Sequence, residues 1–233
     1  MGTLERLERV RAHFLESGMD GVLVTSAENR EYFSGFTGTA GYLLITQEQA
    51  ILGTDFRYVE QAALQSPDYE VARVMSLSEW FKKMVPDLKI TAIGFEDNDM
   101  NVNFHKVLSD VFQSIKPSPK MIPIGNLLEE LRAIKEPGEL ILLEHAVYIA
   151  DTAMERVSEQ IRPGMKEKDI AWLMELNMRE LGADSISFDT IVAAGSNGAR
   201  PHHRAGDYVV QLGDSIVIDM GAKYEGYCSD MTR

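Results

Sequence analysis

The feature that most constrains the fold is an alternation of short apolar runs with amphipathic helical patterns over the first 115 residues. The runs that predict strands are residues 21–25, 41–46, 50–53, 69–74 and 90–95. The patterns that predict helices, with apolar residues every three or four positions, are residues 3–17, 28–33, 56–65, 77–85 and 101–115. Strands that alternate with helices pack as a sheet covered by helices. The sequence therefore predicts an α/β domain over residues 1–125.

A different order follows a proline-rich stretch at residues 116–123. Residues 127–135 predict a linking helix, so we expect a linker over residues 126–136. Two helices are expected at 139–161 and 168–181, and Pro137 suits the first turn of the former. Strands are then expected at 188–194, 208–210, 215–222 and 227–233. This order predicts an α+β domain over residues 137–233.

Composition excludes several classes of protein. With 45% hydrophobic and 25% charged residues, the chain is typical of a globular protein. A net charge of −13 argues against binding to nucleic-acid phosphates, which requires an excess of lysine and arginine. No apolar run is long enough to span a membrane, and the first residues lack the pattern of a signal peptide. A single cysteine, Cys228, indicates a reducing compartment, so we expect a cytoplasmic location.

Two aspartates near the end of the chain suggest a metal site. Asp219 and Asp230 lie in two predicted strands, and a hairpin centred between Tyr224 and Glu225 would place them directly opposite each other. Like charges in that position destabilise a sheet, and a divalent cation would remove the repulsion. The alternative is that both carboxylates flank a turn and are solvated. Gly226 also allows a longer loop with a bulge.

A second group of polar residues follows a loop of small residues at 194–199. His202 and His203 come directly after Pro201, and a neutral histidine there could donate a hydrogen bond or carry a proton. The alternative is a pair of exposed loop histidines. Cys228 is expected to be a small buried strand residue.

Several motifs together resemble the proline-specific metallopeptidases of the pita-bread fold, that is, the prolidases (Xaa-Pro dipeptidases) and Xaa-Pro aminopeptidases. In the second segment the motifs are residues 188–195, 201–202, 213–221 and 226–233. Residues 29–38 and 54–61 resemble the creatinase-type N-terminal domain of that family, and residues 131–139 resemble the junction. The resemblance implies a creatinase-like α/β domain followed by the first part of an α+β pita-bread catalytic domain.

The resemblance also implies roles for six residues. Asp219 matches a ligand of one metal ion, and Asp230 matches a ligand that bridges two. His202 matches a histidine that contacts the substrate during catalysis. Phe188 and Ile191 match residues lining the substrate pocket, and His203 is expected to have a lesser part in substrate binding.

The implied activity is hydrolysis of Xaa-Pro bonds in di- or oligopeptides by a homodimer. It would require two divalent cations, either manganese or cobalt, with zinc as an alternative. The family's remaining ligands, one histidine and two glutamates, would follow position 233, so we expect a chain truncated before them and inactive by itself. The alternatives are a non-catalytic interaction module with the same fold and a creatine hydrolase without metal.

Overall fold

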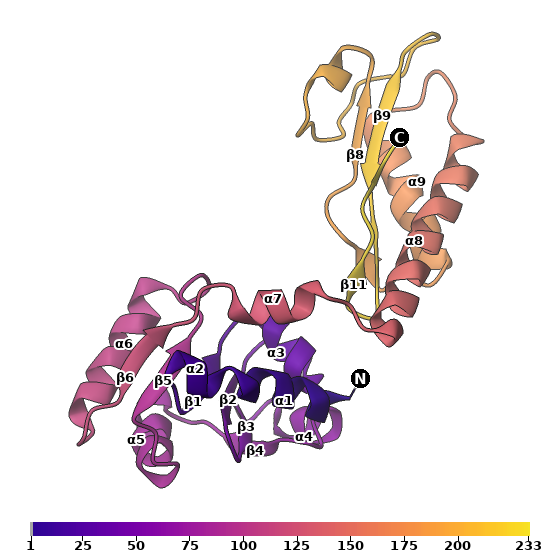
Figure 1. Cartoon of the computed structure of the whole chain (residues 1–233). Helices are drawn as coiled ribbons and strands as arrows, with labels where there is room; N and C mark the ends of the chain where they lie inside the picture. The colour runs from indigo at the N-terminus through magenta and orange to yellow at the C-terminus, as the bar shows by residue number, and fades with distance from the viewer. Residues whose placement is uncertain (1) are drawn as a thin grey trace. The chain divides into compact units, whose positions relative to one another are not determined.

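The computed structural model describes residues 2–233, which divide into two compact units, one ending at Ile134 and the other beginning at Lys135 (Figure 1). The helices of the first unit are α1 (Thr3–Ala12), α2 (Phe14–Ser17), α3 (Ala27–Ser34), α4 (Val59–Gln65), α5 (Leu77–Asp87), α6 (Val102–Ser114) and α7 (Leu127–Ala133). Its strands are β1 (Gly21–Val24), β2 (Tyr42–Thr46), β3 (Ala50–Thr54), β4 (Glu70–Arg73), β5 (Ala92–Phe95) and β6 (Lys120–Pro123).

The six strands of the first unit form one mixed sheet in the order β4-β3-β2-β1-β5-β6. β1, β2 and β3 pair antiparallel, whereas β4, β5 and β6 each pair parallel to their neighbours. The β2–β3 pair is the hairpin that the sequence predicts, because the connection between the two strands is short. The parallel pairs are joined through helices, as parallel connections require.

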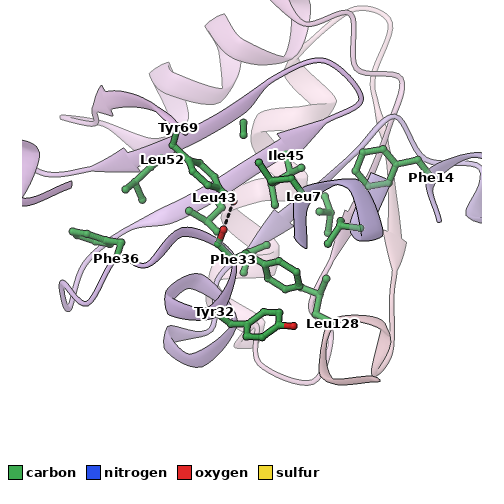
Figure 2. Close-up of a cluster of buried hydrophobic side chains, with 14 of the residues drawn as sticks. Leu7, Phe14, Tyr32, Phe33, Phe36, Leu43, Ile45, Leu52, Tyr69 and Leu128 are labelled. Carbon is green, nitrogen blue, oxygen red and sulfur yellow. Dashed lines mark hydrogen bonds between the residues drawn. The ribbon is translucent and has the colours of Figure 1, made fainter. Parts of the chain in front are cut away.

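Alternation along the strands divides the apolar side chains between two cores. On β1, Val22 and Val24 contribute to one core and Leu23 to the other. The first core also receives buried residues of α1, α2, α3, α4 and α7, and the second receives those of α5 and α6. Figure 2 shows the first core, in which the Tyr69 hydroxyl donates a hydrogen bond of 3.0 Å to the carbonyl oxygen of Phe33. The sheet is therefore covered by helices on both faces, as the sequence predicts.

Two details of the first unit differ from the expectation. The predicted helix 3–17 is interrupted at His13 and forms two helices. Residues 120–123, within the proline-rich stretch for which the sequence predicts no strand, form strand β6 at the edge of the sheet. An edge strand needs backbone partners on one side only, so Pro123 is tolerated at its end.

The helices of the second unit are α8 (Pro137–Ser158), α9 (Glu167–Glu180) and the 3-10 turn η1 (Gly195–Ala199). Its strands are β7 (Ser185–Ile186), β8 (Ile191–Ala194), β9 (Ile216–Met220), β10 (Ala222–Tyr224), β11 (Tyr227–Cys228) and β12 (Met231–Thr232). Pro137 occupies the first turn of α8, where its missing N–H is not needed. Instead of the strand expected at 208–210, the structure has an isolated bridge between Val209 and Lys166.

Strands β9 to β12 of the second unit form one long hairpin, which is interrupted near its middle. β9 and β10 form its first arm, and β11 and β12 return along the second. β8 pairs with β9 and β7 pairs with β10, giving two three-stranded sheets. Alternate residues such as Ile218 and Met220 are buried in a core that includes apolar side chains of α8 and α9. Helices α8 and α9 lie beside these strands in Figure 1.

Within residues 2–233, no helix combines the length and apolarity needed to cross a membrane. The chain division after Ile134 leaves α7 with the first unit, because Leu128 of this helix is buried in its core. The ranges 1–125, 126–136 and 137–233 for two domains and a linker stay predictions.

Candidate active site

The turn of the long hairpin determines where the two aspartates lie. Tyr224 pairs with Tyr227, so the two-residue loop is Glu225-Gly226. Both loop residues have positive φ angles, 45° and 85°, which is the requirement of a type I′ turn. The predicted centre between Tyr224 and Glu225 is wrong, because it would have placed a bulky aromatic residue at a positive φ instead of glycine.

The corrected register places the aspartates diagonally. Asp219 pairs with Thr232, and counting back along the same register places Asp230 opposite Gly221. The predicted direct pairing of Asp219 with Asp230 is therefore wrong by two residues. Because side chains alternate with a period of two, a shift by two keeps both carboxylates on the same face. Diagonal neighbours are separated by roughly 7–8 Å, so repulsion between the two carboxylates is weaker than in a direct pair.

The face that carries Asp219 and Asp230 is opposite the helices. Ile218 and Met220 alternate with Asp219 and point into the helical core, while Asp219 is half-buried and Asp230 is exposed. Thr232 donates a hydrogen bond of 2.8 Å from Oγ1 to Oδ1 of Asp219. Cys228 lies on the second arm of the hairpin and is exposed, contrary to the expectation of a buried cysteine.

Ile191 joins this face through β8. It pairs directly with Asp219, so Ile191, Asp219 and Thr232 form a row across three strands. Ile191 also lines a groove of about 360 Å³. The other residues lining the groove are Lys168, Ala171, Asp189, Thr190, His202, His203, Arg204 and Ala205.

The groove brings together three of the six residues selected from the sequence: Ile191, His202 and His203. His202 is exposed, and the His203 side chain is only 11% exposed. The half-buried Phe188 does not line the groove, nor do the two aspartates. The assignment of all six residues to a single site stays a prediction.

The carboxylates of Asp219 and Asp230 are suitable ligands for a hard divalent cation, but these two side chains do not complete a metal site. Two aspartate oxygens are the ligand type that manganese and magnesium prefer, and zinc or cobalt would need imidazole as well. Among residues 2–233, no group of three or more histidine, cysteine, aspartate or glutamate side chains is arranged to hold a metal ion. Asp219 and Asp230 therefore fit part of a ligand set.

Sequence reasoning missed the residue that organises the groove wall. Glu167, the first residue of α9, is completely buried and accepts four hydrogen bonds. Burial alone would raise the pKa of Glu167, but the donated hydrogen bonds outweigh it and hold the pKa below its ordinary value. An acidic residue in the first turn of a helix is common, so nothing in the local sequence distinguishes Glu167 as a buried residue.

A cluster of ions on the surface links Asp207, in the segment that follows His203, to two lysines at the start of α9. The Asp207 carboxylate forms ion pairs with the ammonium groups of Lys166, at 2.9 Å, and Lys168, at 2.8 Å. Hydrogen bonds from these two lysines lower the pKa of Asp207 to about 2. All three groups are largely solvent-exposed, so the cluster contributes little to stability.

Comparison with known proteins defines the class of this one. Residues 6–134 match the sequence model of the Creatinase/Prolidase N-terminal domain, and residues 142–233 match that of metallopeptidase family M24. The chain therefore belongs to the pita-bread metallopeptidase family that combines these two domains. The family membership and the fold class predicted from the sequence are confirmed.

Three relatives illustrate how similar this chain is to known proteins in sequence and structure. The "Uncharacterized peptidase YqhT" of Bacillus subtilis is 39% identical over 98% of this chain and 64% of its own length. The structure of an Xaa-Pro dipeptidase from Bacillus anthracis matches 100% of this chain and 64% of that chain, with 41% identity and a TM-score of 0.93. The X-Pro aminopeptidase structure from Thermotoga maritima matches 98% and 64%, with 39% identity and a TM-score of 0.87. The chain thus spans about 64% of the length of these relatives.

Proposed function

We propose that this chain is the part of an Xaa-Pro peptidase that supplies the first two metal ligands and one wall of the substrate groove. The observation that carries the proposal is the row across β8, β9 and β12. It joins Ile191, which lines the groove, directly to Asp219, which is a candidate metal ligand. Relatives named Xaa-Pro dipeptidase and X-Pro aminopeptidase support the choice of substrate.

The proposed roles follow from side-chain chemistry. Asp219 and Asp230 would hold divalent cations through their carboxylate oxygens, with Thr232 orienting Asp219 by its hydrogen bond. Bound cations of this kind supply Lewis-acid polarisation and lower the pKa of a water molecule. His202, exposed at the groove, would donate a hydrogen bond to the substrate carbonyl oxygen as negative charge develops there.

Apolar residues would define the proline site. Ile191 presents an aliphatic side chain in the groove, where a pyrrolidine ring could pack against it. Phe188, three residues earlier and half-buried, would extend this apolar surface once a substrate is bound. His203 would contribute at the margin of the groove.

The proposal extends to the metal ion, the cellular location and the oligomeric state of the intact protein. From the family resemblance we propose manganese or cobalt, with zinc as the alternative. The two carboxylates by themselves suit manganese, and cobalt or zinc would also need imidazole. A single cysteine supports a cytoplasmic location. A homodimer is proposed from the family resemblance and is testable by analytical ultracentrifugation.

The test is hydrolysis by the full-length protein supplied with Mn²⁺. Alanyl-proline and alanyl-prolyl-alanine serve as substrates, and released amino acids are quantified by chromatography. We expect cleavage before proline. Asp219→Asn should lower kcat/KM by at least about 100-fold, because it removes a metal ligand. Glu180→Gln, an exposed change on α9, is the matched control.

The two substrates separate the possible outcomes. Preference for the dipeptide defines a dipeptidase, and preference for the tripeptide defines an aminopeptidase. If the metal-loaded full-length protein cleaves neither, the proposed activity is rejected in favour of a non-catalytic module. Release of urea from creatine would reject it in favour of the creatine hydrolase.

A further inference from the structure

The Glu167 carboxylate is saturated by donors from one loop. Oε1 accepts from the backbone N–H of Ala194 at 2.8 Å and from Nδ2 of Asn197 at 2.9 Å. Oε2 lies 2.8 Å from Nε2 of His203 and accepts from the backbone N–H of Gly206 at 3.2 Å. Two carboxylate oxygens offer about four acceptor positions, so each is used. This completeness explains how a charge can be fully buried at modest cost.

The four donors come from separate points of the segment between Ala194 and Gly206, and His203 among them lines the groove. Ala194 ends β8, the strand that carries Ile191. Asn197 belongs to the turn η1, and His203 and Gly206 lie in the returning segment. One side chain of α9 therefore holds the start, middle and end of the loop that carries His202.

The same contact defines the protonation of the His203 ring. The pKa of Glu167 lies below its ordinary value, so the carboxylate is ionised at neutral pH and can only accept. The ring nitrogen facing it, Nε2, must then carry a proton. In a neutral imidazole the other nitrogen, Nδ1, is left as the acceptor. The His203 side chain is 11% exposed, and the residue lines the groove.

We propose that Glu167 is a positioning residue for this groove: it fixes His203 in the Nε2-protonated form and holds the loop bearing His202 against α9. The catalytic consequence rests on the proposed peptidase function. The positioning itself does not, since it concerns contacts within this chain. If Glu167 only stabilised the fold, the isosteric change Glu167→Gln would alter neither the tautomer of His203 nor the effect of His203 on catalysis.

The first experiment measures the His203 tautomer in the full-length protein labelled with ¹⁵N-histidine. In the unsubstituted protein we expect chemical shifts of a ring protonated at Nε2. In Glu167→Gln, the amide group has one accepting oxygen where the carboxylate has two. If that oxygen stays with Ala194 and Asn197, an N–H donor faces His203, and the ring should shift toward the Nδ1-protonated form. A ring protonated only at Nδ1 in the unsubstituted protein overturns the proposal, as does an unchanged tautomer in a folded Glu167→Gln whose amide N–H group faces His203.

The second experiment measures kinetics and metal content. Glu167→Gln is expected to lower kcat/KM on the order of tenfold through misplacement of the groove wall, with bound metal unchanged. Glu180→Gln, which removes an exposed charge from the same helix, should stay within about twofold. His203→Phe should reproduce the loss, and the double substitution should add little to it, because residues in contact are coupled.

Three results test the positioning role of Glu167 and the peptidase function, even if one variant folds poorly. Full additivity of the Glu167 and His203 losses overturns the positioning role. Unaltered kcat/KM in folded Glu167→Gln or in His203→Phe also overturns it. If the unsubstituted protein cleaves no Xaa-Pro bond, the peptidase proposal fails, while the tautomer measurement still supports or rejects the positioning of His203.

Discussion

At the scale of single residues, Gly221 is the position where the long hairpin tolerates no side chain. It separates β9 from β10, and a Cβ atom built on it would collide with the backbone carbonyl oxygen of Ser229. The Ser229 hydroxyl is buried and accepts a hydrogen bond of 2.9 Å from the Ala222 N–H. The two arms therefore approach closely beside the candidate ligand Asp230.

The first prediction is that Gly221→Ala destabilises the second unit. The added methyl group must displace backbone, so we expect a loss of about 1–3 kcal/mol in the free energy of unfolding. Urea unfolding followed by circular dichroism measures the loss. Gly138→Ala is the control, because nothing lies within 4 Å of the added atom and alanine suits helix α8. Equal stability of the two variants would contradict the prediction.

The second prediction concerns acid stability through Glu167. Its pKa in the folded protein is lower than the ordinary value of 4.5, so folding favours the ionised form. The resulting stabilisation is complete above pH 4.5 and is lost as pH falls through the lower folded pKa. Urea unfolding between pH 7 and pH 3 should show a smaller loss of stability in Glu167→Gln than in the unsubstituted protein. Glu180→Gln should retain the original pH dependence, and a retained dependence in Glu167→Gln would refute the assignment.

At the scale of elements, the Glu225-Gly226 turn sets the register of every residue in the hairpin. A shift of the turn by one residue would move the cross-strand register by two residues, so Asp219 and Asp230 would change partners while staying on the same face. Glu225 occupies the first central position with a φ of 45°, which is unfavourable for a residue other than glycine, asparagine or aspartate. The Glu225 N–H donates to Asp184 at 2.7 Å, so a substitution that keeps the backbone keeps this anchor.

The third prediction is that Glu225→Asn stabilises the hairpin. Asparagine adopts positive φ more readily, and Asn-Gly is the preferred type I′ pair. We expect a gain of about 1 kcal/mol, seen as a higher midpoint in thermal unfolding. Gly226→Ala should act in the opposite direction, because it places a Cβ at a φ of 85°. A lower midpoint for Glu225→Asn would contradict the type I′ assignment.

At the scale of the whole molecule, the first unit contains its own complete cores. Both clusters of its sheet are built from residues between Leu7 and Leu128, on helices and strands of that unit. Helix α7 belongs with it, because Leu128 is fully buried there and Arg9 donates a hydrogen bond of 2.8 Å to the carbonyl oxygen of Leu131. A unit of this size with a six-stranded sheet has enough apolar material to fold alone.

The fourth prediction is that residues 1–134 fold independently. The isolated fragment should give a dispersed amide NMR spectrum and a single cooperative urea transition. A fragment ending at residue 125, which lacks α7, is the comparison and should be less stable because it exposes the surface that Leu128 covers. A non-cooperative transition for residues 1–134 would show that the unit depends on the rest of the chain.

Local patterns in the sequence determined much of this protein. The alternation of apolar runs and helical patterns predicted the layered first unit, because strand and helix periods depend on which side chains face a core. Motifs around Asp219, Asp230 and His202 indicated the family, which the comparisons confirmed. Strand β6 escaped prediction because β5, with which it pairs, is distant in sequence and because the prolines before it and at its end suggested the boundary of a domain.

Only the tertiary structure decided the register of the hairpin and the surroundings of the groove. The register depended on a two-residue choice of turn that spacing alone left open. The pairing of Ile191 with Asp219, and the four donors around Glu167, join residues about 30 apart along the chain. Local sequence determines the elements because their periodicity is local, whereas a buried charge and a cross-strand row exist only once distant segments pack together.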